Sequence, residues 1–144
     1  MNFLLDTNVV SEWVKPRPNI NVVRWLAEID EDSAFLSVIT FAEIGHGIAE
    51  MPTGRRKDQL KSWLESDLYY RFERRILNID LAVANAWGGL MSLRRKTGVS
   101  LNPMDAFLAA TAHVHSLTLV TRNTSHFAKT QIALVNPWLG PVSE

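Results

Sequence analysis

The sequence predicts an α/β fold in which helices cover both faces of a mainly parallel sheet. Short apolar runs typical of buried strands alternate along the chain with longer stretches of helical periodicity. Polar residues that favour the start of a helix follow the early apolar runs directly. Because parallel neighbours require crossover connections, this alternation indicates a doubly wound, three-layer α/β/α architecture. We expect one domain that spans residues 1–144.

The first half of the chain is expected to supply two strands and three helices. The unbroken apolar run at residues 3–5 suits a strand buried on both faces. The helix that follows must end before Pro16, because proline has no N–H group to donate. Asn19 or Asn21 can cap the next helix. The expected elements are a strand at 3–5, a helix at 8–14, a helix ending near residue 30, a strand at 34–39 and a helix at 40–49.

The second half is expected to continue the alternation after a polar surface loop at 51–58. Asp80 can cap a long helix that closes at Gly98. Asn102 followed by Pro103 is the favoured order of cap and first helical residue. The expected elements are a helix at 60–68, a strand at 76–79, helices at 80–97 and 103–112, and strands at 117–121 and 132–135.

Composition limits the classes of protein that this chain can represent. Its 144 residues, 47% of them hydrophobic, suit one compact domain with a real core. The absence of cysteine excludes a disulfide framework and a thiolate zinc site, and it fits a reducing cytoplasm. Fifteen basic and fifteen acidic residues give no net charge, so contact with nucleic acid must rely on local patches. No apolar run approaches the roughly 20 residues of a membrane span, so we expect a cytoplasmic protein with no membrane partner.

Acidic or amide side chains follow strands or open helices at one edge of the predicted sheet. Asp6 follows the first strand, and Glu43 lies just after the second. Asp105 opens a late helix, and Asn123 follows the strand at 117–121. In open parallel sheets this edge, beyond the carboxyl ends of the strands, is where ligands bind. The four side chains are therefore candidates for a shared site.

Two of these acids also have a purely structural explanation. Asp6 can cap the helix that follows it. When Asp6 is considered alone, this capping role and a functional role explain the residue equally well. Thr40 and Glu43 match a capping box, in which the glutamate reaches back to the threonine N–H, and for Glu43 alone this is the better interpretation.

Asp105 is harder to explain by structure alone. Asn102 and Asp105 have capping-box spacing, with the shorter acid. However, the positions three, four and seven residues after Asp105 are Leu108, Ala109 and Ala112, which places the carboxylate on the stripe that faces the sheet. A carboxylate on a buried stripe indicates function.

Clustered carboxylates at this edge would need a cation. Two carboxylates about 4 Å apart repel by roughly 4 kcal/mol at an effective dielectric constant near 20, a large share of the roughly 5–15 kcal/mol that stabilises a domain. Oxygen ligands without cysteine favour Mg²⁺, with Mn²⁺ as the alternative, over Zn²⁺. Such an ion can polarise a phosphoryl oxygen and supply a hydroxide-like nucleophile, the chemistry of phosphodiester hydrolysis.

The ordered motifs resemble those of PIN-domain ribonucleases, and among them the VapC toxins of the FitB-like branch. The likeness spans nearly the whole chain. Its motifs are Leu-Leu-Asp6-Thr-Asn-Val-Val-Ser-Glu12, Leu-Ser-Val-Ile-Thr-Phe-Ala-Glu43-Ile, Pro-Met-Asp105-Ala-Phe-Leu-Ala-Ala-Thr-Ala and Leu-Val-Thr121-Arg-Asn123-Thr-Ser-His-Phe127. The Lys-Pro-Arg-Pro-Asn run and the Asn136-Pro137-Trp138 ending are also similar to that branch.

The resemblance implies the toxin of a type II toxin–antitoxin pair. The expected activity is that of a Mg²⁺-dependent endoribonuclease acting on RNA, with an antitoxin protein that occludes the site. The expected assembly is a homodimer or a toxin–antitoxin hetero-oligomer. By position, Asp6 and Asp105 would be the main metal ligands and Glu43 a third acid, while Thr7 and Thr121 would place hydroxyls near the site.

One position departs from the pattern of the family. Asn123 stands where the family often has a fourth Asp, and its amide can accept a hydrogen bond but carries no charge, so a second metal ion is in doubt. Beside it, Arg122 is our better candidate for a phosphate contact than the runs at 55–57 and 94–96, which solvated helix ends explain equally well.

The four histidines and the tryptophans are weaker candidates. His126 and His46 could touch substrate or metal, but ordinary surface roles or support of other ligands are favoured. His113 and His115 carry no functional signal. The five tryptophans mostly occupy apolar helical faces, which favours core or interface positions over base stacking.

Two rival interpretations remain open. A phosphatase similar to the haloacid dehalogenases would need a second Asp two residues after Asp6, where this chain has Asn8. In the second interpretation, the domain no longer binds a metal ion because Asn123 carries no charge. It would then be a catalytically weak or inactive PIN-like module that binds a partner protein. For the enzyme, our hypothesis is in-line attack by water that leaves a 5′-phosphate on the RNA.

Overall fold

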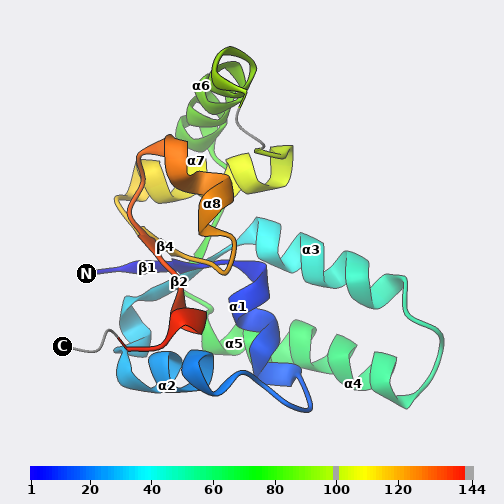
Figure 1. Cartoon of the computed structure of the whole chain (residues 1–144). Helices are drawn as coiled ribbons and strands as arrows, with labels where there is room; N and C mark the ends of the chain where they lie inside the picture. The colour runs from blue at the N-terminus through cyan, green and yellow to red at the C-terminus, as the bar shows by residue number, and fades with distance from the viewer. Residues whose placement is uncertain (99–100, 142–144) are drawn as a thin grey trace.

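The computed structural model describes residues 1–98 and 101–141, and its centre is a five-stranded sheet (Figure 1). The strand order is β3-β2-β1-β4-β5, and each neighbouring pair is parallel. The strands are β1 (Phe3–Leu5), β2 (Ala34–Ser37), β3 (Ile76–Leu77), β4 (Thr118–Val120) and β5 (Leu134–Val135). The predicted parallel sheet is confirmed, with the first strand at its centre.

Helices supply the crossovers between these strands. The α-helices are α1 (Thr7–Ser11), α2 (Ile20–Glu28), α3 (Val38–Ala49), α4 (Arg55–Ser62), α5 (Tyr69–Arg71), α6 (Leu81–Thr97), α7 (Pro103–His115) and α8 (Thr124–Phe127). Short 3-10 turns lie at Glu12–Val14, Glu31–Ser33, Ala128–Thr130 and Pro137–Leu139, and a π-helical turn at Trp63–Leu68 joins α4 to α5.

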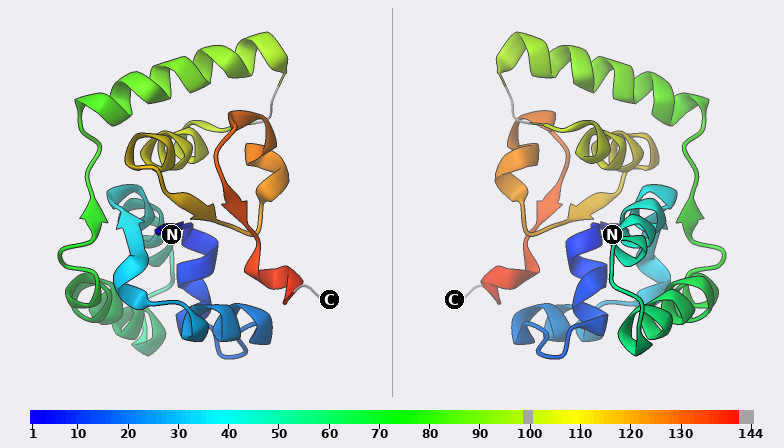
Figure 2. Two further views of the ribbon diagram at one scale, coloured as in Figure 1. Left: turned by 90° about the vertical axis from the view of Figure 1, so that its left-hand side faces the viewer. Right: turned by 90° about the vertical axis from the view of Figure 1, so that its right-hand side faces the viewer.

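The two faces of the sheet are covered by different helices (Figures 1 and 2). Helices α6, α7 and α8 lie over one face, and α1, α2 and the α4–α5 segment lie over the other. Adjacent residues of a strand point to opposite faces, and accordingly Leu4 belongs to a core cluster with α7 while Leu5 belongs to one with α1 and α2. Both leucines are fully buried, which confirms the predicted three-layer architecture.

The boundary between β2 and α3 differs from the prediction. The strand ends at Ser37, whose hydroxyl accepts the Ile39 N–H at 3.0 Å and caps the helix. The proposed capping box of Thr40 and Glu43 is therefore wrong, because Thr40 already lies inside the helix and has no free cap position. Its hydroxyl instead lies 3.3 Å from that of Thr7 on the neighbouring element.

Several other helix and strand boundaries also differ from the prediction. The polar segment at 51–58 becomes helical from Arg55, and the last two strands are shorter than expected because only two or three residues of each form ladder pairs. Helix α8 was not predicted, since its four residues have too little periodicity to indicate a helix. The predicted caps Asn19, Asp80 and Asn102 are confirmed.

Within the described residues, no helix combines the length and the apolar composition that a membrane crossing requires.

Candidate functional site

Asp6 lies at the carboxyl end of β1 and is held in place by three parts of the chain. Its side chain is almost entirely buried, and one carboxylate oxygen accepts the Thr7 N–H at 2.6 Å. The other oxygen accepts the hydroxyl of Thr121, which follows β4, at 2.7 Å. Asp6 thus caps α1, as the structural interpretation expected, and also turns its second oxygen toward the edge of the sheet.

Glu43 is fixed by the hydroxyl of Thr7, the first residue of α1. Thr7 Oγ1 donates to Glu43 Oε1 at 2.8 Å, across a separation of 36 residues in the chain. This contact exists because β1 and β2 are neighbours, so the helices that follow them start side by side. Glu43 is half-buried and points back toward Asp6 rather than serving as a cap of its own helix.

Asp105 is oriented by the cap of its own helix. Asn102 Oδ1 accepts the Asp105 N–H at 2.8 Å, while Asn102 Nδ2 donates to Asp105 Oδ2 at 3.1 Å. The residues expected on the same stripe, Leu108 and Ala109, are fully buried. His126 on α8 approaches from the other side, with Nδ1 at 3.6 Å from Asp105 Oδ2.

The three carboxylates lie close enough to influence one another electrostatically. Burial raises the pKa of Asp6, and the Asp105 carboxylate adds to this, although hydrogen bonds from Thr121 and Thr7 oppose it. Burial and the Asp6 charge raise the pKa of Glu43 against the hydrogen bond from Thr7. Burial and the Glu43 charge raise the pKa of Asp105 against the influence of His126. Such mutual raising is typical of a functional site.

No lysine or arginine forms an ion pair with these acids in the part of the chain that the structure describes. In the same residues, no group of three or more His, Asp or Glu side chains is already drawn together tightly enough to hold a metal ion. The donor set nevertheless suits a hard divalent cation, because it offers three carboxylates without a lysine or arginine partner among the described residues. A cation binding here would replace repulsion with attraction.

The residues after β4 fall into two groups. Thr121 is fully buried and, besides donating to Asp6, its hydroxyl accepts the Asn123 N–H at 3.1 Å. Asn123 itself is exposed. Arg122 turns toward the C-terminal segment, where its guanidinium lies over the Trp138 ring at 5.5 Å from the ring centroid. The structure therefore connects Arg122 to Trp138, and its contact with phosphate stays a prediction.

The other basic and histidine candidates have local partners. Arg56 donates to the Val14 carbonyl, Lys57 to the Ala49 and Met51 carbonyls, and Arg94 to the Leu101 carbonyl. His46 lies 3.9 Å from the exposed Glu50 on its own helix. The tryptophan prediction is confirmed, because all five rings pack against one of the two core clusters.

Glu12 is a buried acid that sequence reasoning did not single out. It is only 2% exposed, its Oε1 accepts the Asn19 N–H at 2.9 Å, and its Oε2 depends on an ion pair with Lys15. Burial alone would raise the pKa of Glu12, but Lys15 and the Asn19 N–H outweigh burial and lower it. The available signal was its position three residues after Val9, on the buried stripe.

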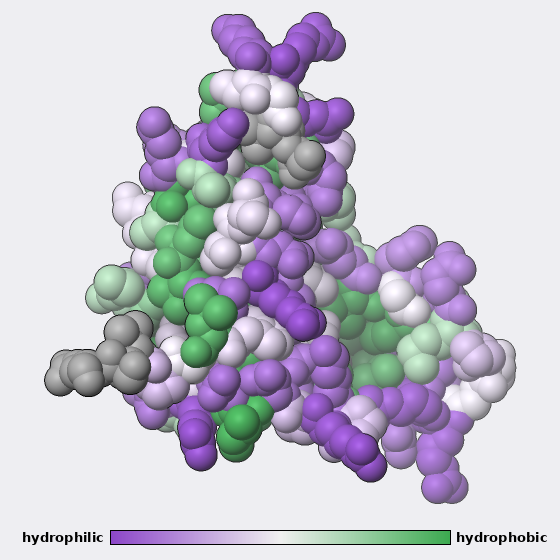
Figure 3. Space-filling view, in the orientation of Figure 1, coloured by the Kyte–Doolittle hydropathy of each residue, from purple (hydrophilic) through white to green (hydrophobic). Residues whose placement is uncertain are grey.

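An apolar groove begins beside Thr7 and Glu43 and runs outward between α1, α3 and α4. Its volume is about 340 Å³. Hydrophobic surface is visible between α3 and α4 in the space-filling view (Figure 3). The apolar side chains that line the groove are those of Val14, Ile44, Ile48, Met51, Leu60 and Trp63.

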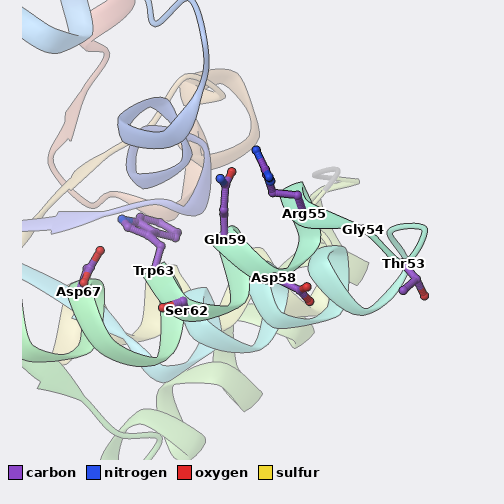
Figure 4. Close-up of a pocket in the computed structure, with 8 residues that line it drawn as sticks. All are labelled: Thr53, Gly54, Arg55, Asp58, Gln59, Ser62, Trp63 and Asp67. Atoms are coloured by element: carbon purple, nitrogen blue, oxygen red, sulfur yellow. The ribbon is translucent and has the colours of Figure 1, made fainter.

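A second hollow, of about 680 Å³, lies on the outer flank of α4. Figure 4 shows its side chains, among them Arg55, Asp58 and Asp67, spread along the helix rather than converging on a point. It contains none of the predicted site residues. The candidate site is therefore at the sheet edge and not in this hollow.

Comparison with known proteins agrees with this fold and motif order. The model of the PIN domain family matches residues 3–132. Toxin FitB of Neisseria gonorrhoeae is 40% identical over 135 residues, covering 94% of this chain and 97% of that protein. VapC ribonuclease Y4jK of Sinorhizobium fredii is 34% identical over 135 residues, covering 94% of this chain and 96% of that protein.

A solved structure described as FitAB bound to an IR36 DNA fragment superimposes with a TM-score of 0.90. Its matching chain is 37% identical, and the match covers 99% of this chain and 98% of that one. Sequence similarity and fold thus agree, and the chain belongs to the PIN domain family.

Proposed function

We propose that this protein is a metal-dependent endoribonuclease that acts as the toxin of a toxin–antitoxin pair, and that the whole chain works as one domain. The observation that carries the proposal is the gathering of three carboxylates at one edge of the sheet without a lysine or arginine partner among the described residues. Hydrogen bonds from Thr121, Thr7 and Asn102 hold Asp6, Glu43 and Asp105, respectively. The names of the relatives, a FitB toxin and a VapC ribonuclease, support the same activity.

The residues divide the work of holding a divalent cation and its substrate. Asp6 and Asp105 would be the main ligands, with Glu43 orienting a water molecule. Thr121 and Thr7 hold Asp6 and Glu43 by hydrogen bonds, so these carboxylates are positioned before any ligand arrives. When bound, Mg²⁺ or Mn²⁺ would polarise the phosphoryl group and increase the acidity of the attacking water.

The proposed reaction is hydrolysis of an RNA phosphodiester. The water oxygen bonds to phosphorus, the bond from phosphorus to the 3′ oxygen breaks, and a proton passes to that leaving oxygen. Glu43 is placed to accept the proton that water releases, because the Thr7 hydroxyl holds its carboxylate at the edge of the sheet next to Asp6. The products are a 3′-hydroxyl and a 5′-phosphate, whereas a 2′,3′-cyclic phosphate would contradict this mechanism.

We propose that the antitoxin occupies the apolar groove between α1, α3 and α4. An apolar segment laid in this groove would end beside Thr7 and Glu43 and would exclude RNA from the acids. The related solved structure described as FitAB bound to DNA supports a partner of this kind. The complex would have lower ribonuclease activity than the free protein.

Cleavage of RNA by two isosteric variants tests the proposed activity. Asp6→Asn and Asp105→Asn should each lower the rate of Mg²⁺- or Mn²⁺-dependent cleavage by about 10³-fold, because each removes a charge that must hold the cation. Glu28→Gln, on exposed helix α2, is the matched control and should cleave like the wild type. Equal cleavage by all four proteins would rule out this site, and no metal-dependent cleavage by the wild type would favour an inactive, partner-binding module.

A further inference from the structure

We infer that His126 is a nitrogen ligand of the metal ion, paired with Asp105, and that it shifts the preference of the site from Mg²⁺ toward Mn²⁺. This inference rests on the proposed function, because it assigns one more residue to the same cation. It concerns a residue outside the acidic motif, on the short helix α8 that sequence reasoning did not predict.

The separation of the two donor atoms carries the inference. His126 Nδ1 and Asp105 Oδ2 are 3.6 Å apart, which is too long for a hydrogen bond. Two ligands at about 2.1 Å from one cation stand roughly 3.0–3.5 Å apart, depending on the coordination angle. The pair therefore needs only a small adjustment to share an ion.

The pair is open to solvent, and its carboxylate is fixed by a neighbouring amide. The side chain of His126 is 46% exposed and that of Asp105 is 16% exposed, so solvent reaches both side chains. Asn102 Nδ2 donates to Asp105 Oδ2 at 3.1 Å. A ligand oriented in this way by a neighbouring amide is typical of metal sites.

The sequence around α8 gives a chemical reason for a histidine ligand beside Asp105. Asn123 supplies no charge at the start of this helix, and its side chain is not used as the helix cap. His126 lies three residues later, about one turn along α8, and adds a nitrogen donor close to Asp105. Imidazole is a better ligand for transition metals than for Mg²⁺, which prefers oxygen, so this exchange of donors should change the metal preference.

Pulsed electron paramagnetic resonance of Mn²⁺ bound to the full chain tests the inference. We expect nitrogen coupling to the Mn²⁺ signal in the wild type and its loss in His126→Asn. The control His113→Asn removes an exposed histidine near the far end of α7 and should retain the coupling. Wild-type protein labelled with ¹⁵N only in histidine should show the ¹⁵N pattern, which gives a result even if the variant fails to fold.

Metal titration gives a second measurement on the same proteins. His126→Asn should weaken Mn²⁺ binding by about tenfold while changing Mg²⁺ binding by less than about threefold. The wild type could bind Mn²⁺ without nitrogen coupling, while Asp105→Asn fails to bind it. This result would overturn the inference and leave the proposed function standing. Failure of the wild type to bind Mn²⁺ or Mg²⁺ at all would overturn both.

Discussion

Glu12 and Asp6 are two buried carboxylates, six residues apart in the chain, whose pKa values are shifted in opposite directions. Glu12 is 2% exposed and has a nearby ammonium and a backbone N–H, so its pKa is lowered. Asp6 is 5% exposed, and burial raises its pKa, with the nearby Asp105 carboxylate adding to the shift, despite hydrogen bonds from Thr121 and Thr7. The two residues have similar exposed fractions, but Glu12 lies beside the positive charge of Lys15 whereas Asp6 lies near the negative charge of Asp105.

The difference separates a structural carboxylate, Glu12, from Asp6, which we propose to be functional. Glu12 fixes the turn between α1 and α2, because its Oε1 holds the N–H of Asn19, the cap of α2. The acids around Asp6 make the metal-free protein less stable than it could be, which a domain tolerates only where function requires it. Four predictions, from the largest expected effect to the smallest, test this contrast.

Metal binding should stabilise the wild type, and it should act only through the acidic edge, the sheet edge with Asp6, Glu43 and Asp105. A cation at 100 times its Kd adds about 2.7 kcal/mol to the free energy of unfolding, if it binds only the folded state. Mg²⁺ or Mn²⁺ titrated during thermal unfolding should therefore raise the Tm of the wild type and of Glu12→Gln equally. An equal rise in Asp105→Asn would place the ion elsewhere.

Removing the Glu12 side chain should destabilise the protein whether or not metal is present. Glu12→Ala loses a charged hydrogen bond to Asn19 and leaves a gap, a cost of about 2 kcal/mol. This corresponds to a fall in Tm of about 4–8 °C for a chain of this size. Lys15→Met is the comparison variant and should also destabilise the protein, because it leaves the buried Glu12 Oε2 without its ion-pair partner.

Removing charge from the acidic edge should have the opposite sign in metal-free protein. Asp105→Asn eliminates repulsion from Glu43 while an amide oxygen can still accept from Asn102. We expect a gain of about 1 kcal/mol, measured by urea unfolding in the presence of a chelator. A variant less stable than the wild type under these conditions would mean that the acids are structural.

The pH dependence of stability should show the same contrast on a smaller scale. The folded pKa of Glu12 lies below its ordinary value of 4.5, so its stabilising contribution is present above that value and is lost as pH falls through the folded pKa. The folded pKa of Asp105 lies above its ordinary value of 3.8, so its contribution is present below that value and is lost as pH rises through the folded pKa.

Unfolding series without metal should therefore diverge between two variants. Relative to the wild type, Glu12→Gln should lose its disadvantage as pH falls below about 4.5. Asp105→Asn should lose its advantage as pH falls toward 3.8. Parallel curves for the two variants would show that the two carboxylates do not differ as described.

Much of the molecule could be predicted because local signals and fold agree. The apolar run at 3–5, the caps Asn19 and Asp80 and the Asn102-Pro103 pair each fix an element by side-chain chemistry within a few residues. Parallel order followed from the alternation of strands and helices, since neighbouring parallel strands must be joined by crossovers.

The sequence by itself determined the architecture, the family motifs and the edge at which the acids gather. Only the tertiary structure decided that Glu43 bonds to Thr7 instead of capping α3, that Arg122 lies over Trp138, and that His126 reaches Asp105. The physical reason is that capping, periodicity and burial are set by near neighbours in the chain. Charge compensation depends on which side chains the sheet brings together from distant segments.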